Sequence, residues 1–195
     1  MALASRQDLQ DYSLRRLGHP VIDPVFQDFA NKTNAVSLTN PGITTALEFK
    51  DGKLMLGNTS SLEEIDYPRI LSVAGEGAFI DMLAKAKIVS IVNWTMIPKM
   101  TSILLEIVEH IMPNLPPADT RNFFFDLTDP AKRSTEDLRE VLQVISRYQA
   151  HAEVTLGLNY NESLQVCQTL GLQEGDKDKD ALCRIASDIR RKLGI

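Results

Sequence analysis

Cysteine and histidine are scarce in this sequence, and their scarcity argues against several kinds of protein. The two cysteines, Cys167 and Cys183, are too few for a disulfide scaffold and lack the spacing of a metal site. We expect both to be buried free thiols in a reducing compartment. The histidines, His19, His110 and His151, also lack a mutual spacing that suits a metal ion.

An excess of basic charge and long apolar runs are missing as well. The chain has 21 basic and 26 acidic residues and a formal net charge of −5, so no positive surface for nucleic acid or anionic membranes is indicated. No apolar run approaches the roughly eighteen residues of a membrane span. Arg6 and Asp8 interrupt the amino end before a signal peptide could form. We expect a cytoplasmic protein that binds neither membranes nor nucleic acid.

Motifs of some other functional classes are also absent. No serine stands in a G-x-S-x-G elbow, so a hydrolase nucleophile is not indicated. The segment "GEG" at 75–77 lacks the spacing of a phosphate-binding loop, and we expect it to separate helical segments because glycine is costly in a helix. The segment "DKDKDA" at 176–181 alternates acids like a calcium loop, but Ala181 occupies the turn position that needs glycine. We expect a solvated helix start there.

The chain does contain a regular alternation of strand and helix patterns from about residue 86 onward. Short apolar runs predict strands at 86–94, 121–127 and 151–159, and apolar residues at helical spacing follow each of them. Ser134 and Asp137 have the spacing of a capping box. Alternating strands and helices predict parallel crossover units, and therefore an α/β fold with helices covering a largely parallel sheet.

The earlier part of the chain is less uniform. Residues 36–57 contain two β-like runs joined through Asp51 and Gly52, a pair that suits the positive backbone angles of a tight hairpin turn. We expect a small β-hairpin there, within a single domain over residues 1–195, because 195 residues suffice for one generous domain at roughly 150 residues each.

Three polar residues recur where the expected strands end. Asn93, Asp126 and Asn159 are each separated by 33 positions, and open α/β sheets usually bind ligands at the carboxyl ends of their strands. The spacing has two interpretations: a shared binding crest, or simply the length of one strand–helix unit followed by a polar loop. Trp94, which follows Asn93, either lines a pocket there or packs in the core.

Asn159 and Glu162 also have two interpretations. An asparagine with a glutamate three residues later forms a capping box, in which each side chain accepts a backbone N–H bond of the helix start. An amide and a carboxylate at the mouth of a sheet can also orient water around Mg²⁺, which prefers oxygen ligands and keeps much of its hydration shell. Both roles are compatible.

Several segments, in this order, resemble the PfkB-type sugar kinases of the ribokinase-like superfamily, and the similarity extends over roughly residues 18 to 195. They are "NPGITTALEFKDGKLML", "DLTDPAKRS", "EDLREVLQVISRY" and "LGLNYNESLQVCQTLG". The resemblance implies a three-layer α/β/α fold and the transfer of a phosphoryl group from ATP to a sugar hydroxyl. Asn159 and Glu162 match the family's N-x-x-E motif, which organises Mg²⁺, through water, and the phosphates of ATP. Asp126 is a weaker match on the phosphate side, and Asn93 is a candidate sugar-binding residue.

The sequence departs from the family in ways that leave the activity open. The glycine-rich, sugar-contacting amino-terminal segments and the G-A-G-D motif, which supplies the family's anion hole and catalytic base, are not recognised here. We therefore assign no catalytic base and expect a truncated, central part of such a kinase. The alternative is a non-catalytic nucleotide- or sugar-binding or assembly protein that kept the fold. A truncated sheet would also expose an edge strand that a partner chain, such as a second copy, would cover.

Overall fold

The computed structural model describes residues 12–116, 121–173 and 177–195. The chain divides into two compact units, Met1–Met82 and Leu83–Ile195 (units 1 and 2 below), with the boundary inside helix α3 (Glu76–Lys85). The expected single domain stays a prediction.

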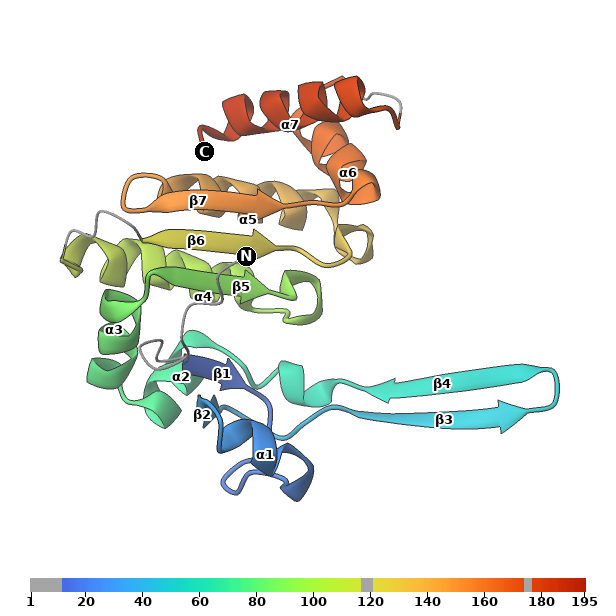
Figure 1. Cartoon of the computed structure of the whole chain (residues 1–195), viewed down its shortest axis with the longest axis vertical. Helices are drawn as coiled ribbons and strands as arrows, with labels where there is room; N and C mark the ends of the chain where they lie inside the picture. The colour runs from blue at the N-terminus through green and yellow to red at the C-terminus, as the bar shows by residue number, and fades with distance from the viewer. Residues whose placement is uncertain (1–11, 117–120, 174–176) are drawn as a thin grey trace, which may run out of the picture. The chain divides into compact units, whose positions relative to one another are not determined.

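Unit 2 is built on a parallel sheet of three strands. β5 (Ile88–Val92), β6 (Asn122–Asp126) and β7 (Glu153–Gly157) pair side by side in this order, and their arrows point the same way in Figure 1. All three lie inside the ranges that the apolar runs predict. The α/β class with a largely parallel sheet is therefore confirmed.

Helices connect these strands and cover one face of the sheet. α4 and α5 lie on that face, α6 begins just after β7, and α7 lies beyond the β7 edge (Figure 1). Their bounds are α4 (Met100–Glu106), continued by a π-helical turn η4 (Ile107–Ile111) and a 3₁₀ turn η5 (Met112–Asn114), α5 (Thr135–Tyr148), α6 (Tyr160–Leu170) and α7 (Lys179–Leu193). Two further 3₁₀ turns follow strands, η3 (Trp94–Met96) and η6 (Pro130–Lys132).

The helix starts follow from local side-chain chemistry. The Ser134 hydroxyl accepts from the Asp137 N–H at 3.0 Å and Asp137 accepts from the Ser134 N–H, so α5 begins with the predicted capping box. Asp178 accepts from the N–H groups of Asp180 and Ala181 at 2.9 Å and so caps α7. These backbone bonds lower the pKa of the Asp178 carboxyl, the bond from Ala181 most of all. The described part of the acidic segment thus leads into α7, which begins at Lys179, and Asp176 lies outside the described residues.

The core of unit 2 centres on an aromatic cluster. Phe123 and Phe125 point to the covered face of β6, where their ring centroids lie 4.8 and 5.3 Å from the centroid of Tyr148 on α5. The Tyr148 hydroxyl donates to the Leu104 carbonyl on α4 at 2.8 Å, and burial raises the pKa of this phenol. The cluster therefore ties β6, α5 and α4 together.

The opposite face of the same sheet is open among the described residues. Ile88 is 69% exposed and Val92 is 43% exposed, both on the face that also carries Phe124. The Phe124 ring lies over Gly157, where an added Cβ would approach Phe124 Cζ to 2.9 Å. Gly157 is thus needed for close packing of the ring across β7.

Unit 1 combines a short parallel pair of strands, a hairpin and small helices. β1 (Tyr12–Arg15) pairs with β2 (Asn34–Ser37), and β3 (Ile43–Phe49) pairs antiparallel with β4 (Gly52–Asn58). The other elements are η1 (Pro24–Phe26), α1 (Gln27–Ala30), η2 (Ser60–Leu62) and α2 (Tyr67–Ala74). The predicted hairpin is therefore present.

The turn of this hairpin differs from the expected one. Phe49 pairs with Gly52, so Lys50 and Asp51 form the turn and Gly52 already belongs to β4. None of Lys50, Asp51 and Gly52 has a positive φ angle. Among the described residues, positive φ angles occur at Asn93, Thr128 and four glycines outside this turn. The prediction of an Asp51–Gly52 turn with positive angles was wrong because the strand register moves the turn back by one residue.

Two smaller expectations are also corrected. Gly75, with φ 82°, ends α2 as expected, but Gly77 lies inside α3, which starts at once at Glu76. Cys167 is buried and Cys183 is exposed, and neither forms a disulfide. Cys183 points outward because the buried stripe of α7 is made by Ala181, Ile185 and Ile189.

The structure was also searched for membrane-spanning helices. Within the described ranges, none of the helices combines the length and the apolar character that crossing a bilayer requires.

The two faces of β6 predict unequal responses to the same substitution. We expect Phe125→Leu to lower the free energy of unfolding by about 1–2 kcal/mol, because Phe125 is 1% exposed and contacts Tyr148. Phe124→Leu, on the open face, should cost clearly less. Urea denaturation of both variants measures the difference, and equal losses would contradict this assignment of the two faces.

Candidate functional site

The carboxyl ends of the three parallel strands bring the predicted polar residues to one edge of the sheet. Val92, Asp126 and Gly157 are aligned across β5, β6 and β7. Asn93 therefore lies one residue past this line, Asp126 lies on it, and Asn159 lies two residues beyond it. The 33-residue spacing therefore brings all three to the same edge of the sheet, called the crest below. They differ in how far along the strand direction each one lies.

Asn159 and Glu162 form the capping box of α6. Asn159 Oδ1 accepts from the Glu162 N–H at 3.0 Å, and Glu162 Oε2 accepts from the Asn159 N–H at 2.9 Å. Glu162 is 8% exposed, so its carboxylate is held in one orientation close to the end of β7. The structural interpretation of the pair is confirmed.

The box leaves part of the pair's bonding capacity unused. Glu162 binds the helix start through Oε2, and Oε1 makes no hydrogen bond to any residue in the part of the chain that the structure describes. Carboxylate oxygens have several lone pairs, so Oε1 retains the capacity to accept a bond from water or to bind a cation. Capping and ligand binding therefore do not compete for the same oxygen.

Thr128 links the two other crest residues and was missed by the sequence analysis. Its N–H donates to Asp126 Oδ1 at 2.8 Å, and its hydroxyl lies 3.5 Å from Asn93 Oδ1. Both Thr128 (φ 73°) and Asn93 (φ 68°) have left-handed backbones. This conformation is strained for a β-branched residue, and such strain concentrates at functional sites. No feature of the sequence signals it, because threonine rarely adopts this conformation.

The crest residues fall into two groups. Asn93, Asp126 and Thr128 form one, and Asn159 with Glu162 forms the other. Within the described ranges, no hydrogen bond or ion pair joins the two groups. Neighbouring strands lie about 4.8 Å apart, so the two groups lie at the ends of adjacent strands.

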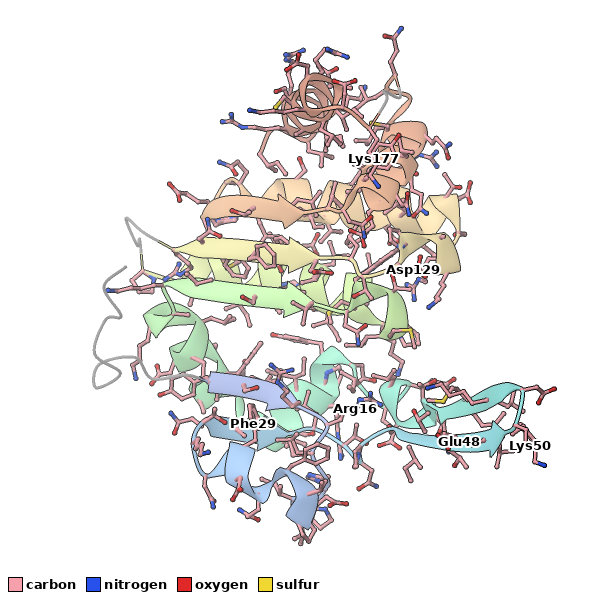
Figure 2. The ribbon with its side chains drawn as sticks, turned by 45° about the vertical axis from the view of Figure 1, so that its right-hand side comes forward. Arg16, Phe29, Glu48, Lys50, Asp129 and Lys177 are labelled. Carbon is pink, nitrogen blue, oxygen red and sulfur yellow. The ribbon has the colours of Figure 1, made fainter. Side chains whose placement is uncertain are left out.

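Basic side chains also lie near these strand ends. Lys177 Nζ is 5.5 Å from the centroid of the Tyr160 ring, at the first residue of α6, and Lys132 pairs with Asp129 at 3.3 Å. Figure 2 shows Lys177 and Asp129 on the side of the sheet toward which the strands point. Lys177 therefore adds positive charge next to the Asn159–Glu162 pair.

Trp94 belongs to the core of unit 2 and does not line a pocket. It is 1% exposed, its Nε1 donates to Thr101 Oγ1 at 2.9 Å, and the Arg133 guanidinium lies 4.8 Å from its ring centroid. The aromatic stacking holds Arg133 beside α5.

A mainly apolar groove of about 520 Å³ runs along the outer edge of β7 to Asn159. Its walls come from β7, α6 and α7 and include Val154, Leu156, Ser163, Ile185 and Ile195. An apolar groove that ends at a few polar groups is typical of small-molecule sites.

The residues of the crest fit a water-mediated magnesium ion but not a protein cage. Among the described residues, no three His, Cys, Asp or Glu side chains cluster closely enough to hold a metal ion. Mg²⁺ commonly binds one or two carboxylates and completes its shell with water and substrate phosphates. One fixed carboxylate beside an amide satisfies that pattern.

Comparison with known proteins identifies the family. A model described as prokaryotic ketohexokinase matches residues 10–195. The chain belongs to the prokaryotic ketohexokinase family. A ketohexokinase of Haloferax volcanii is 26% identical over 166 residues, which are 85% of this chain and 44% of the relative. The chain thus spans about half the length of that curated relative. No solved structure matches.

Membership in the prokaryotic ketohexokinase family confirms the resemblance to PfkB-type sugar kinases. The matched residues include most of unit 1, all of unit 2 and the whole strand-end crest. The roles of Asn93, Asp126, Asn159 and Glu162 in binding stay predictions.

The strained backbone of Thr128 predicts an unusual response to glycine. We expect Thr128→Gly to leave the free energy of unfolding unchanged or to raise it by up to about 1 kcal/mol, because glycine adopts positive φ without strain. Thr155→Gly, at an ordinary strand position of β7, should lower it by about 1 kcal/mol. Chemical denaturation measures both changes, and an equal loss in the two variants would argue against strain at Thr128.

Proposed function

We propose that this chain takes part in the transfer of the γ-phosphoryl group of ATP to a hydroxyl of a ketohexose. Membership in the prokaryotic ketohexokinase family and the name of the Haloferax relative support this reaction class. The observation that carries the proposal is the Asn159–Glu162 pair, fixed at the end of β7 with one carboxylate oxygen left over. We expect the protein to act in the cytoplasm.

The rigidity of this pair matters for phosphoryl transfer. Such reactions depend mainly on positioning and on electrostatic stabilisation of the transferring group, with magnesium neutralising the phosphates. Glu162 is held by its own bond to the helix start, so its second oxygen needs little reorganisation to order water. Asn159 contributes the amide end of the same box.

The other crest residues would contribute less to the binding of ATP and the sugar. Asp126, already bound to the Thr128 N–H, faces the phosphate side in this proposal. Asn93 would contact the sugar, and Lys177 would attract the phosphates of ATP. We assign no catalytic base to any residue of this chain.

The second candidate is a nucleotide- or sugar-binding protein without transferase activity. The observation that favours it is that no acidic residue of this sequence matches the family's catalytic base, while Asn159 and Glu162 of the N-x-x-E motif are both present. Binding without transfer is the property that distinguishes this candidate from a kinase.

Two capping boxes of the same form allow a matched test of the binding pair. Calorimetric titration with ATP should show binding that requires Mg²⁺ and that Glu162→Ala weakens at least tenfold, about 1.4 kcal/mol. Asp137→Ala, which removes the acid from the corresponding box of α5, should leave this affinity unchanged. Both variants should lose similar thermal stability, because both lose a helix-capping bond.

The outcomes separate the two roles of Glu162. Equal loss of stability with no specific effect on MgATP would limit Glu162 to capping α6. A coupled assay with ATP and D-fructose then separates the candidates. Transfer supports a kinase, and Mg²⁺-dependent binding without transfer supports the non-catalytic protein.

A further inference from the structure

A second cavity of unit 2 lies among three helices, away from the strand-end crest. Its volume is about 310 Å³, and its walls come from α5, α6 and α7. It reaches the end of α6 at Thr169 and Leu170, whereas the Asn159–Glu162 pair lies at the beginning of that helix. At a rise of 1.5 Å per residue, Thr169 lies about 10 Å from Glu162 along the helix axis. The cavity is therefore separate from the candidate site.

Two basic side chains border this cavity without a strong carboxylate partner. Arg139 comes from α5 and Lys192 from α7. Arg139 Nη1 lies 4.0 Å from Glu136 Oε1, and that carboxylate is 81% exposed, so the ion pair is weak. Lys192 makes no ion pair and no side-chain hydrogen bond within the ranges that the structure describes. The cavity thus carries two positive charges that protein groups leave largely uncompensated.

The ends of α6 and α7 at the cavity do not engage these two cations. The N–H groups of Gly171 and Gly194 donate to carbonyl groups in the last turns of α6 and α7, at 3.2 and 2.9 Å. The Ser146 hydroxyl of α5 donates to the Leu193 carbonyl of α7 and so ties two walls of the cavity together. The basic groups therefore stay available for a ligand.

Neutral polar groups add hydrogen-bond donors to the same cavity. Thr169 is 8% exposed, and its hydroxyl makes no hydrogen bond in the described part of the chain. The Gln143 side-chain amide of α5 is likewise unpaired among the described residues. Buried polar groups are nearly always hydrogen-bonded, so a buried hydroxyl left unpaired in a cavity indicates a partner outside the chain, either water or a ligand.

Apolar side chains complete the cavity. Leu142 is fully buried and Leu193 is 6% exposed, and both lie in the wall beside the polar groups. A concave site of roughly 300 Å³ or more that combines apolar walls with a few convergent polar groups is typical of small-molecule binding.

We propose that this cavity binds a small phosphate monoester, with Arg139 and Lys192 holding the phosphate group from α5 and α7. A phosphate monoester carries about −1.5 to −2 charges at neutral pH and three acceptor oxygens, so it matches two cations better than a single carboxylate does. Thr169 and Gln143 donate to the remaining phosphate oxygens. The organic part of the ligand packs against Leu142.

An amide NMR titration of the whole chain with glycerol 3-phosphate tests the proposal. We expect saturable shifts at the amides of Gln143 and Thr169, and Lys192→Gln should weaken binding about fivefold because it removes one charge-assisted hydrogen bond. Arg139→Gln should weaken binding by a similar factor. Glycerol without the phosphate group should leave these amides unshifted.

Arg191→Gln is the matched control for Lys192→Gln. It removes the same charge from the neighbouring position of α7, but Arg191 pairs with Asp188 and does not line the cavity. We expect the affinity for glycerol 3-phosphate to change by less than about twofold in this control, because an exposed charge contributes little. An equal loss of affinity in the two variants would reduce the binding to general charge attraction and overturn the proposal.

The remaining outcomes separate this site from the proposed function. Glu162→Ala should leave the affinity for glycerol 3-phosphate unchanged. Loss of binding in that variant would place the phosphate at the strand ends and overturn the proposal, as would a spectrum that does not respond to glycerol 3-phosphate or responds equally to glycerol. The titration requires neither ATP nor a ketohexose, so its result stands whether or not the chain takes part in phosphoryl transfer.

Discussion

The contact of Tyr148 with Phe123 and Phe125 is the interaction on which the arrangement of unit 2 depends. It fixes α5 against the middle strand, and the bond from the Tyr148 hydroxyl to Leu104 adds α4 to the same cluster. With both helices anchored on one face, the three strands keep a common register and end at the same edge. The candidate site at the strand ends is therefore positioned by apolar packing on the covered face of the sheet. The residues of this packing are not themselves part of the site.

Local backbone chemistry then sets the orientation of the site residues. The capping box of α6 turns the Glu162 carboxylate toward the strand ends, while the left-handed backbones of Asn93 and Thr128 bring their side chains within reach of each other. The box stabilises its helix and the left-handed residues cost stability. A strained crest next to a well-capped helix is a local structure in which side chains keep one orientation, and such strain concentrates at functional sites.

Each unit exposes apolar side chains to solvent, but on a different kind of surface. In unit 2, Ile88 and Val92 leave one sheet face open, although parallel sheets are usually covered on both faces. In unit 1, every residue of β3 and β4 is exposed, including Ile43, Phe49 and Leu54. Both are apolar surfaces, and burying them against other polypeptide would be favourable because it removes apolar area from water.

The sequence alone determined the features that depend on neighbours along the chain. Apolar periodicity located the strands and helices of unit 2, the spacing of Ser134 with Asp137 and of Asn159 with Glu162 identified both capping boxes, and ordered motifs indicated the kinase family. Only the tertiary structure decided the turn at Lys50 and Asp51, the exposure of Cys183 and the strained link through Thr128. These features depend on strand register and on which helix face packs inward. Both are set by contacts between residues distant in the chain, which local patterns do not encode.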